Sequence, residues 1–472
     1  MKLEELRREI DAIDDELIEL FVKRMNISLK VAEYKKENDL PVLNSEREND
    51  ILLMVTEKAG SRLAPYAGDF FSNIFSISRS YQNSHLSKYG LVGGNLSYSY
   101  SKTIHEALGD YPYELYSLGP AEFEALMRSR DFVGLNITAP YKKAVIPYCD
   151  ELTDTAAEIG AVNTVYKKGD KLIGANTDYD GFLYILKRSG ISLKNKKILI
   201  LGAGGASLTV QKCARDAGAS EITAAVRGYD FSSERGAEII INATPVGTFP
   251  DNGGKLIDLA GFPKCEGVID VVYNPLYTDL LLRAREKGIA YSGGMPMLVA
   301  QATAAAELFT GKEYSHKNEE ILNRLTASVQ NIVFIGMPGA GKSTLGQRVA
   351  EALNRTFIDT DLAVSEKAGM PVEGIFEKFG EKRFRDMETE IIKEAGKKHA
   401  LVIATGGGCV LREENLDALR QNAILFFLDI PVELLDTKDR PLSKDLETLK
   451  KMYKNRLPLY EKYGDYRIVK QK

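Results

Sequence analysis

Residues 336–343 read Gly-Met-Pro-Gly-Ala-Gly-Lys-Ser and stand between an apolar run, NIVFI at residues 331–335, and the helical pattern STLGQRVAEAL at residues 343–353. A glycine-rich turn between a strand and a helix lets several backbone N–H groups converge on phosphate oxygens. In such a turn Lys342 reaches the β and γ oxygens and Ser343 binds Mg²⁺, while the helix N-terminus adds a favourable dipole. The stretch predicts an α/β P-loop domain that binds a nucleotide, and it leaves the phosphoryl acceptor open.

Five motifs after this loop indicate the acceptor. They are Asp359-Thr-Asp361, the run GEKRFRDMETE with Arg385 and Glu388, the triplet Gly406-Gly407-Gly408, Arg440-Pro-Leu and Arg456-Leu-Pro-Leu-Tyr460. Arg385 and Arg456 suit bidentate capture of a carboxylate. Asp361 can orient or deprotonate a hydroxyl, and the glycines allow a flat polyol to approach closely.

In these motifs residues 331–472 resemble shikimate kinase. The resemblance implies that Arg385, Arg456 and the glycine triplet bind shikimate, that Asp361 lies beside the phosphorylated hydroxyl, and that Arg440 sits on a lid over the phosphates. The implied ATP contacts and Mg²⁺ ligands are Gly339, Ala340, Gly341, Lys342, Ser343 and Thr344, with Ser343 and Asp359 at the metal. The segment leading to Arg440 is shorter than in the family, which predicts weaker ATP binding. A generic P-loop nucleotidase is the alternative.

A second glycine-rich turn lies in KKILILGAGGAS at residues 196–207. It stands between a strand pattern and a helix, as in dinucleotide-binding domains, although such turns are common. The next strand, EITAAV, is followed by Arg227, where an NAD site would present an acidic residue for the ribose hydroxyl. Arg227 suits a 2′-phosphate instead, so the sequence favours NADP.

Residues 88–313 carry further motifs that resemble shikimate dehydrogenase. These are Ser99-Tyr-Ser101, Asn136-Ile-Thr138-Ala-Pro-Tyr-Lys142, Gly160-Ala-Val-Asn163, Asn176-Thr-Asp178, Asn242-Ala-Thr244, Tyr273-Asn-Pro and Gly294-Met-Pro-Met297 with Gln301. The reaction needs a proton donor for a ketone as a hydride arrives, and Lys142 paired with Asp178 suits general acid–base work.

The resemblance implies a substrate lobe over about residues 88–190 plus the C-terminal helices, and an NADP lobe over about residues 191–290. Ser99 and Ser101 would bind the carboxylate of 3-dehydroshikimate, and the other implied substrate contacts are Thr138, Asn163, Tyr273 and Gln301. The implied cofactor contacts are Gly202, Ala203, Gly204, Gly205, Ala206, Arg227, Thr244, Gly294 and Met297. The stretch from Arg227 to Asn242 is shorter than in the family, which predicts that a helix of the NADP lobe is trimmed.

The N-terminal segment has the sequence pattern of long helices. Apolar residues from Leu3 to Leu20 follow a three-four spacing, which predicts a helix of about 34 residues and about 50 Å that ends before Pro41. Two more helical stretches follow, at residues 45–58 and 65–83. A domain of about 85 residues cannot wrap so long a helix by itself, so we expect a dimer, whether the segment is an enzyme or a coiled-coil module.

Basic residues on this first helix predict how the dimer is built. Arg24 and Lys35 are 11 residues apart in the sequence, and therefore share one helix face to within about 20°. Arg7 lies about 25 Å from Arg24 along the axis and about 100° round it. One small ligand cannot contact both on one helix, whereas a two-fold partner could supply its own Arg7. The spacing predicts an intertwined homodimer with sites shared between chains.

Residues 1–86 resemble the all-α chorismate mutases. That reaction needs cations for two carboxylates and a donor at an ether oxygen whose negative charge grows in the transition state. The implied contacts are Arg7, Arg24 and Arg47 for the carboxylates, Lys35 and Gln82 for the ether oxygen, Glu48 for the hydroxyl, and Ser78 one turn before Gln82. The alternatives are a regulatory and dimerisation module that binds chorismate or prephenate, and a scaffold in which one or more domains are inactive.

Composition fits a multidomain globular enzyme. The chain has 472 residues, enough for three domains, with 44% apolar and 27% charged residues and a net charge of −4. Charges of both signs are interspersed, which argues against a nucleic-acid partner. The first residues, MKLEELRREIDAIDD, lack the apolar core of a signal peptide, and no apolar run is long enough for a membrane helix. Four scattered cysteines favour reduced thiols in the cytoplasm.

The sequence therefore predicts three enzymes in one chain: an all-α chorismate mutase at residues 1–86, a two-lobed α/β dehydrogenase with a Rossmann-like NADP lobe at residues 88–313, and an α/β P-loop kinase at residues 331–472. Residues 314–330 are predicted to form a polar helical linker. The predicted cofactors are NADP, ATP and Mg²⁺, and the predicted substrates are chorismate, 3-dehydroshikimate and shikimate.

Overall fold

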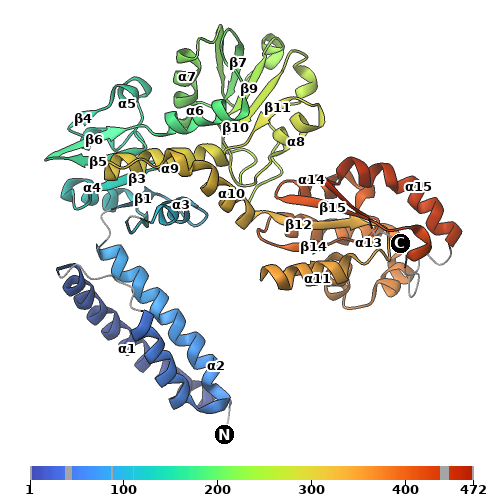
Figure 1. The fold of residues 1–472 in the computed structure, drawn as a ribbon, viewed down its shortest axis with the longest axis horizontal. Helices are drawn as coiled ribbons and strands as arrows, with labels where there is room; N and C mark the ends of the chain where they lie inside the picture. Colours follow the sequence, from blue (N-terminus) through green and yellow to red (C-terminus); the bar gives the residue numbers. More distant parts are fainter. Residues whose placement is uncertain (1–2, 38–44, 87–88, 110, 436–445, 470–472) are drawn as a thin grey trace. The chain divides into compact units, whose positions relative to one another are not determined.

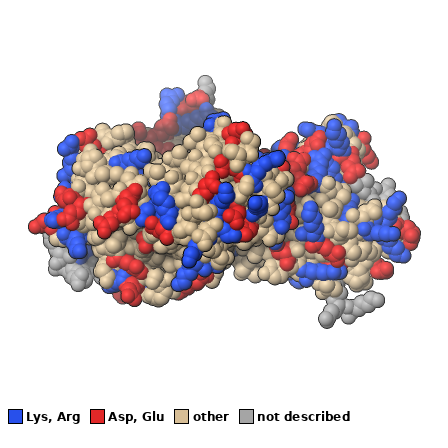
Figure 2. Space-filling model, turned by 90° about the horizontal axis from the view of Figure 1, so that it is seen from above, with Lys and Arg blue, Asp and Glu red and all other residues tan. Residues whose placement is uncertain are grey.

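The computed structural model describes residues 3–37, 45–86, 89–109, 111–435 and 446–469, and the chain divides into two compact units (Figure 1). The first comprises Met1–Thr153, Val162–Ala175 and Leu308–Thr310, and the second Asp154–Ala161, Asn176–Glu307 and Gly311–Lys472. None of the described helices combines the length and apolarity needed to cross a membrane. On the face that Figure 2 shows, basic and acidic side chains are interspersed.

Two long helices open the first unit: α1, Leu3–Glu37, and α2, Ser45–Leu86 (blue in Figure 1). α2 bends at Gly60, where φ is 73° and ψ is 160°, a conformation that glycine adopts without strain. The bend separates the two helical stretches predicted from the sequence. Pro65 follows it within the element, close enough to the new start that its missing N–H costs little.

The helix pair buries few of its apolar side chains. Met25, Ala32, Val55 and Phe75 are buried where α1 and α2 contact each other. Many other large apolar side chains of the pair are more than a third exposed: Leu3, Leu6, Ile10, Ile13, Leu17, Ile18, Leu20, Val22, Ile27, Val31, Leu53, Met54, Leu63, Tyr66, Phe70 and Ile77. So much open apolar surface is unusual for a helix pair that has no partner.

A six-stranded sheet completes the first unit, in the order β2-β1-β3-β5-β6-β4. Its strands are β1 Tyr89–Gly93, β2 Glu114–Ser117, β3 Gly134–Ile137, β4 Glu151–Leu152, β5 Thr164–Lys168 and β6 Lys171–Ala175, and its helical segments are α3 Ser101–Leu108, α4 Pro120–Ser129 and η1 Ile146–Tyr148. β1 and β3 are parallel neighbours, and β5 runs antiparallel to β3. The loops after β1 and β3 therefore leave the sheet at the same edge as the start of β5.

The second unit begins with a fully parallel sheet in the order β11-β10-β9-β7-β8. Its strands are β7 Lys197–Leu201, β8 Glu221–Ala225, β9 Ile239–Asn242, β10 Gly267–Asp270 and β11 Ala290–Ser292. The accompanying helical segments are α5 Asp154–Ile159, α6 Asp178–Ser189, α7 Gly205–Asp216, η3 Leu259–Gly261, α8 Asp279–Glu286 and α9 Met295–Thr310.

Both faces of this sheet are covered. Ile198 and Ile200 of β7 pack with α6 and α7 on one face, whereas Leu199 and Leu201 pack with α8 on the other. Such alternation is the expected pattern of a strand buried on both sides. The connection from β8 to β9, all of which the structure describes, contains only the short η2, Phe231–Glu234. The predicted trimming of a helix falls at this connection.

A buried carboxylate lies at the end of β10. Asp270 is fully buried and accepts hydrogen bonds from Asn242 Nδ2 at 2.9 Å, from the Val272 backbone N at 3.0 Å and from Thr278 Oγ1 at 2.6 Å. Burial nevertheless raises the pKa of Asp270 to about 6, and the three hydrogen bonds only partly offset it. The network ties the carboxyl ends of β9 and β10 together.

The last part of the second unit is a parallel sheet in the order β13-β14-β12-β15-β16. Its strands are β12 Asn331–Gly336, β13 Phe357–Asp359, β14 Val402–Ala404, β15 Ala423–Asp429 and β16 Tyr466–Val469. Its helical segments are α11 Lys342–Leu353, α12 Thr360–Ala368, α13 Val372–Gly396, η5 Cys409–Leu411, α14 Glu413–Arg420, η6 Val432–Leu434 and α15 Leu446–Tyr463.

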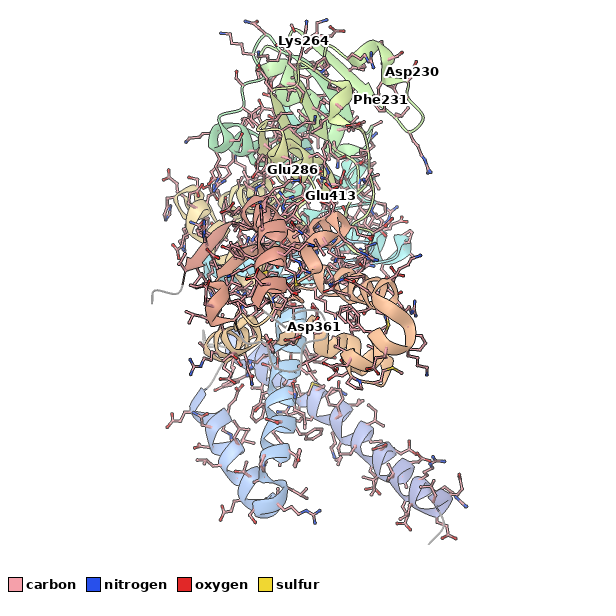
Figure 3. The ribbon with its side chains drawn as sticks, turned by 90° about the vertical axis from the view of Figure 1, so that its right-hand side faces the viewer. Asp230, Phe231, Lys264, Glu286, Asp361 and Glu413 are labelled. Atoms are coloured by element: carbon pink, nitrogen blue, oxygen red, sulfur yellow. The ribbon has the colours of Figure 1, made fainter. Side chains whose placement is uncertain are left out.

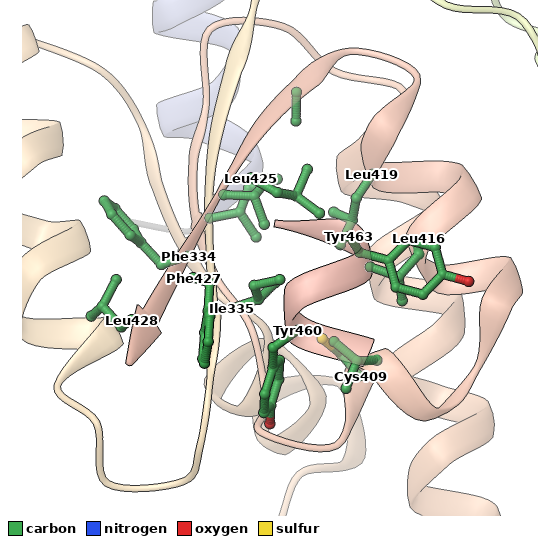
Figure 4. Packing of buried hydrophobic residues seen from close by; sticks show 14 of the residues in the cluster. Phe334, Ile335, Cys409, Leu416, Leu419, Leu425, Phe427, Leu428, Tyr460 and Tyr463 are labelled. Atoms are coloured by element: carbon green, nitrogen blue, oxygen red, sulfur yellow. The ribbon is translucent and has the colours of Figure 1, made fainter. Parts of the chain in front are cut away.

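A single core supports this last sheet (Figure 4). Phe427 of β15 stacks on Tyr460 of α15 with ring centroids 5.0 Å apart, and both side chains are buried. The Tyr460 hydroxyl leaves the core at its edge and donates to the Gly407 carbonyl. The packing of α15 thereby fixes the backbone of the glycine triplet.

The segment predicted as a linker is helical. It contains η4, Ser315–Lys317, and α10, Asn318–Val329, and Ile321, Leu322 and Leu325 on α10 are buried. Thr303 of α9 donates to Asn318 at 2.7 Å, and Arg355 donates to the Gln330 carbonyl at 2.8 Å. The connection is therefore packed along its length, as a flexible linker would not be.

Asp270→Asn should change the pH dependence of stability. Because the folded-state pKa of Asp270 is raised, the stabilisation present below pH 4 is lost as pH rises through about 6. The amide cannot ionise, so the unfolding free energy of the variant relative to wild type should rise over that window by up to about 3 kcal/mol and then stay level. Chemical denaturation monitored by hydrogen exchange in β10 measures it. Parallel profiles from pH 4 to pH 7.5 would show that Asp270 does not titrate in this window.

Candidate active sites

The turn at residues 336–343 has the backbone that phosphate binding requires. Gly336, Gly339 and Gly341 have φ of 146°, 79° and 85°, which side-chain-bearing residues rarely adopt. Lys342 is buried at the start of α11, and its Nζ donates to the Gly336 carbonyl at 2.9 Å and to the Met337 carbonyl at 2.8 Å. The ammonium group is thus held across the loop, as the sequence predicts.

Two predicted metal ligands lie beside this loop. The Ser343 hydroxyl donates to Asp359 Oδ2, while Asp359 Oδ1 accepts the backbone N–H groups of Asp361 and Leu362 at 3.0 and 3.2 Å. A hydroxyl and a carboxylate oxygen at a phosphate-binding loop are the hard ligands that Mg²⁺ takes in such sites. The donor set therefore fits a magnesium ion.

The glycine triplet lies against the predicted acceptor groups. A methyl group built on Gly406 would lie 2.5 Å from both Asp361 Oδ1 and Glu388 Oε1. One built on Gly407 would lie 2.5 Å from the Pro338 ring in the phosphate loop. Only glycine leaves this space open. The triplet therefore brings the predicted acceptor site next to the predicted phosphate loop.

Charged groups in this site are buried without full pairing. Arg385 Nη1 donates to Glu388 Oε2 at 2.8 Å, and Arg456 Nη1 donates to the Gly407 carbonyl at 2.9 Å. Asp361 Oδ1, Glu388 Oε1 and Arg385 Nε are buried with no hydrogen-bond partner among the described residues. Buried polar atoms are rarely left so, and groups of this kind gather where ligands bind.

The same surroundings tune Asp361. Its pKa rises to about 6, mainly through burial and then through the negative charges of Glu388 and Asp359. A carboxylate with a raised pKa is a better proton acceptor for a hydroxyl at neutral pH. The sequence analysis assigned no role to Glu388, although it stands one helical turn after Arg385. Arg440 lies outside the described residues, as does the lid predicted around it.

In the first unit, predicted substrate ligands meet at one edge of the sheet. Ser99 Oγ donates to Ser101 Oγ at 3.2 Å at the start of α3. Thr138 follows β3, and its N donates to the Val92 carbonyl at 2.9 Å. Asn163 is buried just before β5, and the Val162 N donates to the Lys142 carbonyl at 2.8 Å. The backbone thus brings Thr138, Lys142 and Asn163 to neighbouring positions.

In the second unit, the predicted cofactor turn follows β7. Gly202 has a φ of 114°, and a methyl group there would lie 2.9 Å from the Ala243 carbonyl. Gly204 caps α7 and Gly205 begins it, followed by Ala206 in the helix, so the N-terminus of α7 is open to an anion. Arg227 is exposed in the turn after β8. The glycine turn, the helix N-terminus and the exposed Arg227 together fit a dinucleotide with a 2′-phosphate.

Other predicted residues of this unit lie on α6, on α9 and in the loops after β9 and β10. Asp178 begins α6 and is buried, and Thr244 donates to Asn242 Oδ1 at 2.7 Å after β9. Burial raises the pKa of Tyr273, and Met297 is buried on α9, where its carbonyl oxygen would lie 2.7 Å from a methyl group on Gly181. Gln301 Nε2 donates to the Leu298 carbonyl at 2.9 Å. Lys142 belongs to the first unit and Asp178 to the second, so their pairing stays a prediction.

The helix pair carries a third cluster. Arg24 is half-buried, its guanidinium carbon lies 5.7 Å from the centre of the Phe75 ring, and its Nη1 has no hydrogen-bond partner among the described residues. Burial lowers the Arg24 pKa, and Glu48 partly opposes this effect. Gln82 donates to Ser78 Oγ at 3.2 Å, and both are buried.

Two other predicted mutase residues, Arg7 and Glu48, carry ion-pair partners. Arg7 is 61% exposed and pairs with Glu4 at 3.1 Å; Arg47 is also exposed, and Lys35 is half-buried. Glu48 forms an ion pair with Arg79, a residue that the sequence motifs did not single out. Arg79 stands next to Ser78 and one turn before Gln82, which was the available signal.

Known proteins match each of the three parts. The family model for chorismate mutase type II matches residues 6–83, that for the shikimate dehydrogenase substrate binding domain matches residues 91–165, and that for shikimate kinase matches residues 338–472. "Shikimate dehydrogenase (NADP(+))" of Pelodictyon phaeoclathratiforme is 36% identical over 259 residues, which cover 48% of this chain and 92% of the relative. That of Caldicellulosiruptor saccharolyticus is 35% identical with the same coverage.

Solved structures give similar matches. A chorismate mutase/shikimate 5-dehydrogenase fusion protein from Clostridium acetobutylicum is 31% identical, with a TM-score of 0.47 and coverage of 50% of this chain and 96% of that chain. Shikimate dehydrogenase 1 from Peptoclostridium difficile is 30% identical, with a TM-score of 0.47 and coverage of 50% and 97%. From the sequence matches, the chain belongs to the shikimate dehydrogenase family and carries a chorismate mutase domain before that enzyme and a shikimate kinase domain after it.

Proposed function

We propose that this chain catalyses three reactions of aromatic biosynthesis: reduction of 3-dehydroshikimate with NADPH, phosphorylation of shikimate with ATP and Mg²⁺, and rearrangement of chorismate to prephenate. The observation that carries the proposal is the convergence of buried, incompletely paired charges, Asp361, Glu388 and Arg385, on the glycine triplet beside the phosphate loop. The dehydrogenase relatives and the mutase match support the other two reactions. The four cysteines form no disulfide, which supports a cytoplasmic location.

In the kinase, ATP bound at residues 339–344 supplies the phosphoryl group, with Mg²⁺ held by Ser343 and Asp359. Arg385 and Arg456 hold the shikimate carboxylate as paired donors. Asp361 accepts the proton of the attacking hydroxyl, and its raised pKa suits that transfer near neutral pH. Glu388 keeps Arg385 oriented. Lys342 and the N–H groups of the loop neutralise charge on the phosphates.

In the dehydrogenase, NADPH bound at the turn after β7 supplies the hydride. Lys142 donates the proton to the ketone oxygen, with Asp178 as its carboxylate partner. Ser99 and Ser101 bind the substrate carboxylate, and Thr138, Asn163, Tyr273 and Gln301 bind the remaining polar groups. Arg227 holds the 2′-phosphate, and Thr244, Gly294 and Met297 line the cofactor site.

In the mutase, Arg24, Arg47 and a second chain's Arg7 bind the two carboxylates, and Lys35 and Gln82 donate to the ether oxygen. A homodimer through α1 and α2 would cover the exposed apolar side chains of both helices. The exposed position of Arg7 also suits a regulatory module that binds chorismate or prephenate without turnover, and mutase assays separate these alternatives.

Gly408→Ala should weaken shikimate binding. A methyl group at Gly408 would lie 2.1 Å from Nη2 of Arg385, so the guanidinium must leave its place beside Glu388. The loss of a charge-assisted pair predicts a rise of at least about 10-fold in the KM for shikimate. Gly374→Ala in α13 is the control, since its methyl group meets only contacts of 3.9 Å. Equal KM values for shikimate in the two variants would show that Arg385 does not bind this substrate.

The three sites should fail independently. Lys35→Ala, Lys142→Ala and Lys342→Ala should each lower the mutase, dehydrogenase or kinase activity, respectively, by at least about 100-fold, because each removes a charge or a proton from one transition state. The other two activities of each variant serve as its folding control. An unchanged dehydrogenase rate in Lys142→Ala would refute the assignment of that site.

Complementation tests the shared mutase sites. Inactive Arg7→Ala and inactive Arg24→Ala chains, mixed after mild unfolding, should regain mutase activity, because each heterodimer contains one site with both arginines and one site with neither. Light scattering and tagged pull-down measure heterodimer formation. Heterodimers without activity would place both arginines in the site of a single chain.

A further inference from the structure

Two loops of the dehydrogenase's cofactor lobe contact the kinase domain within the second unit. The loops are residues 243–254, after β9, and residues 271–278, after β10. Their kinase counterparts lie around the end of α14 and the loop into β15, together with His399. Because ligands of parallel α/β sheets bind at the carboxyl ends of the strands, these contacts fall on loops that also face the cofactor edge.

The loop after β10 is held by backbone hydrogen bonds. The Leu276 N donates to Asn422 Oδ1 at 3.0 Å, and the Tyr277 N donates to the Gln421 carbonyl at 2.9 Å. The Asn274 side-chain oxygen lies 3.0 Å from His399 Nε2. Three positions of this loop, Asn274, Leu276 and Tyr277, are therefore set by kinase residues.

The loop after β9 is held by two hydrogen bonds with the Gln421 side chain. Asn252 Nδ2 donates to Gln421 Oε1 at 3.2 Å, and Gln421 Nε2 donates to the backbone carbonyl of Asn252 at 3.0 Å. Asn252 is 3% exposed, Gln421 8% and Asn422 1%. The side-chain nitrogens of both residues and Gln421 Oε1 are paired across this contact, whereas Asn252 Oδ1 is buried with no hydrogen-bond partner among the described residues. A shift of the loop would also leave the paired groups unsatisfied, so the two bonds favour one arrangement.

An ion-pair network surrounds the amides. Arg283 of α8 pairs with Glu413, at 3.2 Å, and with Asp417, and Arg420 pairs with Glu286 at 2.6 Å. Glu286 and Glu413 lie side by side in Figure 3, and their carboxylate oxygens and one of Asp417 fall within 4.8 Å of one another. Because two guanidinium groups already pair with these acids, the cluster is an interdomain ion-pair network.

The two loops are also linked to each other and to the cofactor site. The Phe249 N donates to the Asn274 carbonyl at 2.9 Å, and Asp270 joins Asn242 to Thr278. A methyl group on Gly294 would lie 2.1 Å from the Val271 carbonyl, so the start of α9 rests on the same loop. A displacement of residues 271–278 would therefore reach Gly294, Tyr273 and Thr244.

We propose that the kinase domain is a positioning partner of the dehydrogenase, and that Gln421 and Asn422 of the kinase hold the loops after β9 and β10 in the conformation that binds NADPH. The inference rests on the proposed dehydrogenase function. Gln421 and Asn422 act through the loops they hold and contact neither substrate nor cofactor. The dehydrogenase then depends on a neighbouring enzyme for its full affinity for NADPH.

The test is a set of substitutions at the amide pair in the full-length chain. Gln421→Ala removes both bonds and should raise the KM and the Kd for NADPH by about 5-fold, the effect of a coupling near 1 kcal/mol, with kcat at saturating NADPH within 2-fold by the same estimate. Asn252→Ala keeps the bond from Gln421 to the backbone carbonyl of residue 252 and should raise both values by less. The double variant should be no worse than Gln421→Ala.

Glu414→Ala is the matched control, because Glu414 is also on α14 but pairs with Lys393 within the kinase. It should leave NADPH binding unchanged. Hydrogen exchange of residues 243–254 and 271–278, measured without ligand, should accelerate in Gln421→Ala and not in Glu414→Ala. Kinase activity should stay near wild type in every variant.

Faster loop exchange with unchanged NADPH affinity would overturn the proposal. A double variant with a clearly higher KM for NADPH than Gln421→Ala would also overturn it. A wild-type chain that binds NADPH but does not reduce 3-dehydroshikimate would refute the proposed function instead. In that case the Kd for NADPH and the hydrogen exchange of the two loops would still test the inference.

Discussion

The close contact at Gly407 sets the geometry on which the kinase site depends. Its α-carbon lies against Pro338 of the phosphate loop so tightly that a methyl group would fall 2.5 Å from the ring. Its carbonyl accepts from Arg456 and from Tyr460, which is anchored in the core by Phe427. Phosphoryl transfer requires two substrates at a fixed separation. The contact between Gly407 and Pro338 sets that separation, because a side chain at position 407 would push the glycine triplet away from the phosphate loop.

The same constraint recurs at the cofactor sheet. Gly202 approaches the Ala243 carbonyl, and Gly294 approaches the Val271 carbonyl. In each case a glycine lets one carboxyl-end loop rest on its neighbour, which brings several loops within reach of one ligand. The buried charged groups differ in how completely they are hydrogen-bonded, and this difference separates a structural group from groups at a ligand site. Asp270 is satisfied by three donors, whereas Asp361, Glu388 and Arg385 keep unpartnered atoms.

The sequence predicted best what is encoded locally. The phosphate loop, the turn after β7 and the length of α1 follow from spacing within a few residues, and the structure agrees with each. The three fold classes follow from periodicity. Arg79 was missed, and Glu388 was named in its motif without a role, because the importance of each arises from contacts across the fold, with Glu48 and Gly406, respectively. Spacing alone also gave no sign that α10 would be packed, or that kinase residues would bond to the loops after β9 and β10.

A covalent connection changes what an interface between two enzymes needs. Because α10 is packed at both ends, the dehydrogenase and the kinase meet at a high effective concentration, and no large apolar surface is required to join them. A few buried amides can then help to fix the arrangement, since most of their polar atoms are paired across the contact. The ion pairs Arg283–Asp417 and Arg420–Glu286 are also largely shielded from solvent, whereas Glu413, which pairs with Arg283, is 61% exposed, so salt weakens that pair most. The amides and the shielded ion pairs therefore carry the specificity of the contact together, because any other arrangement would leave buried polar groups unpaired.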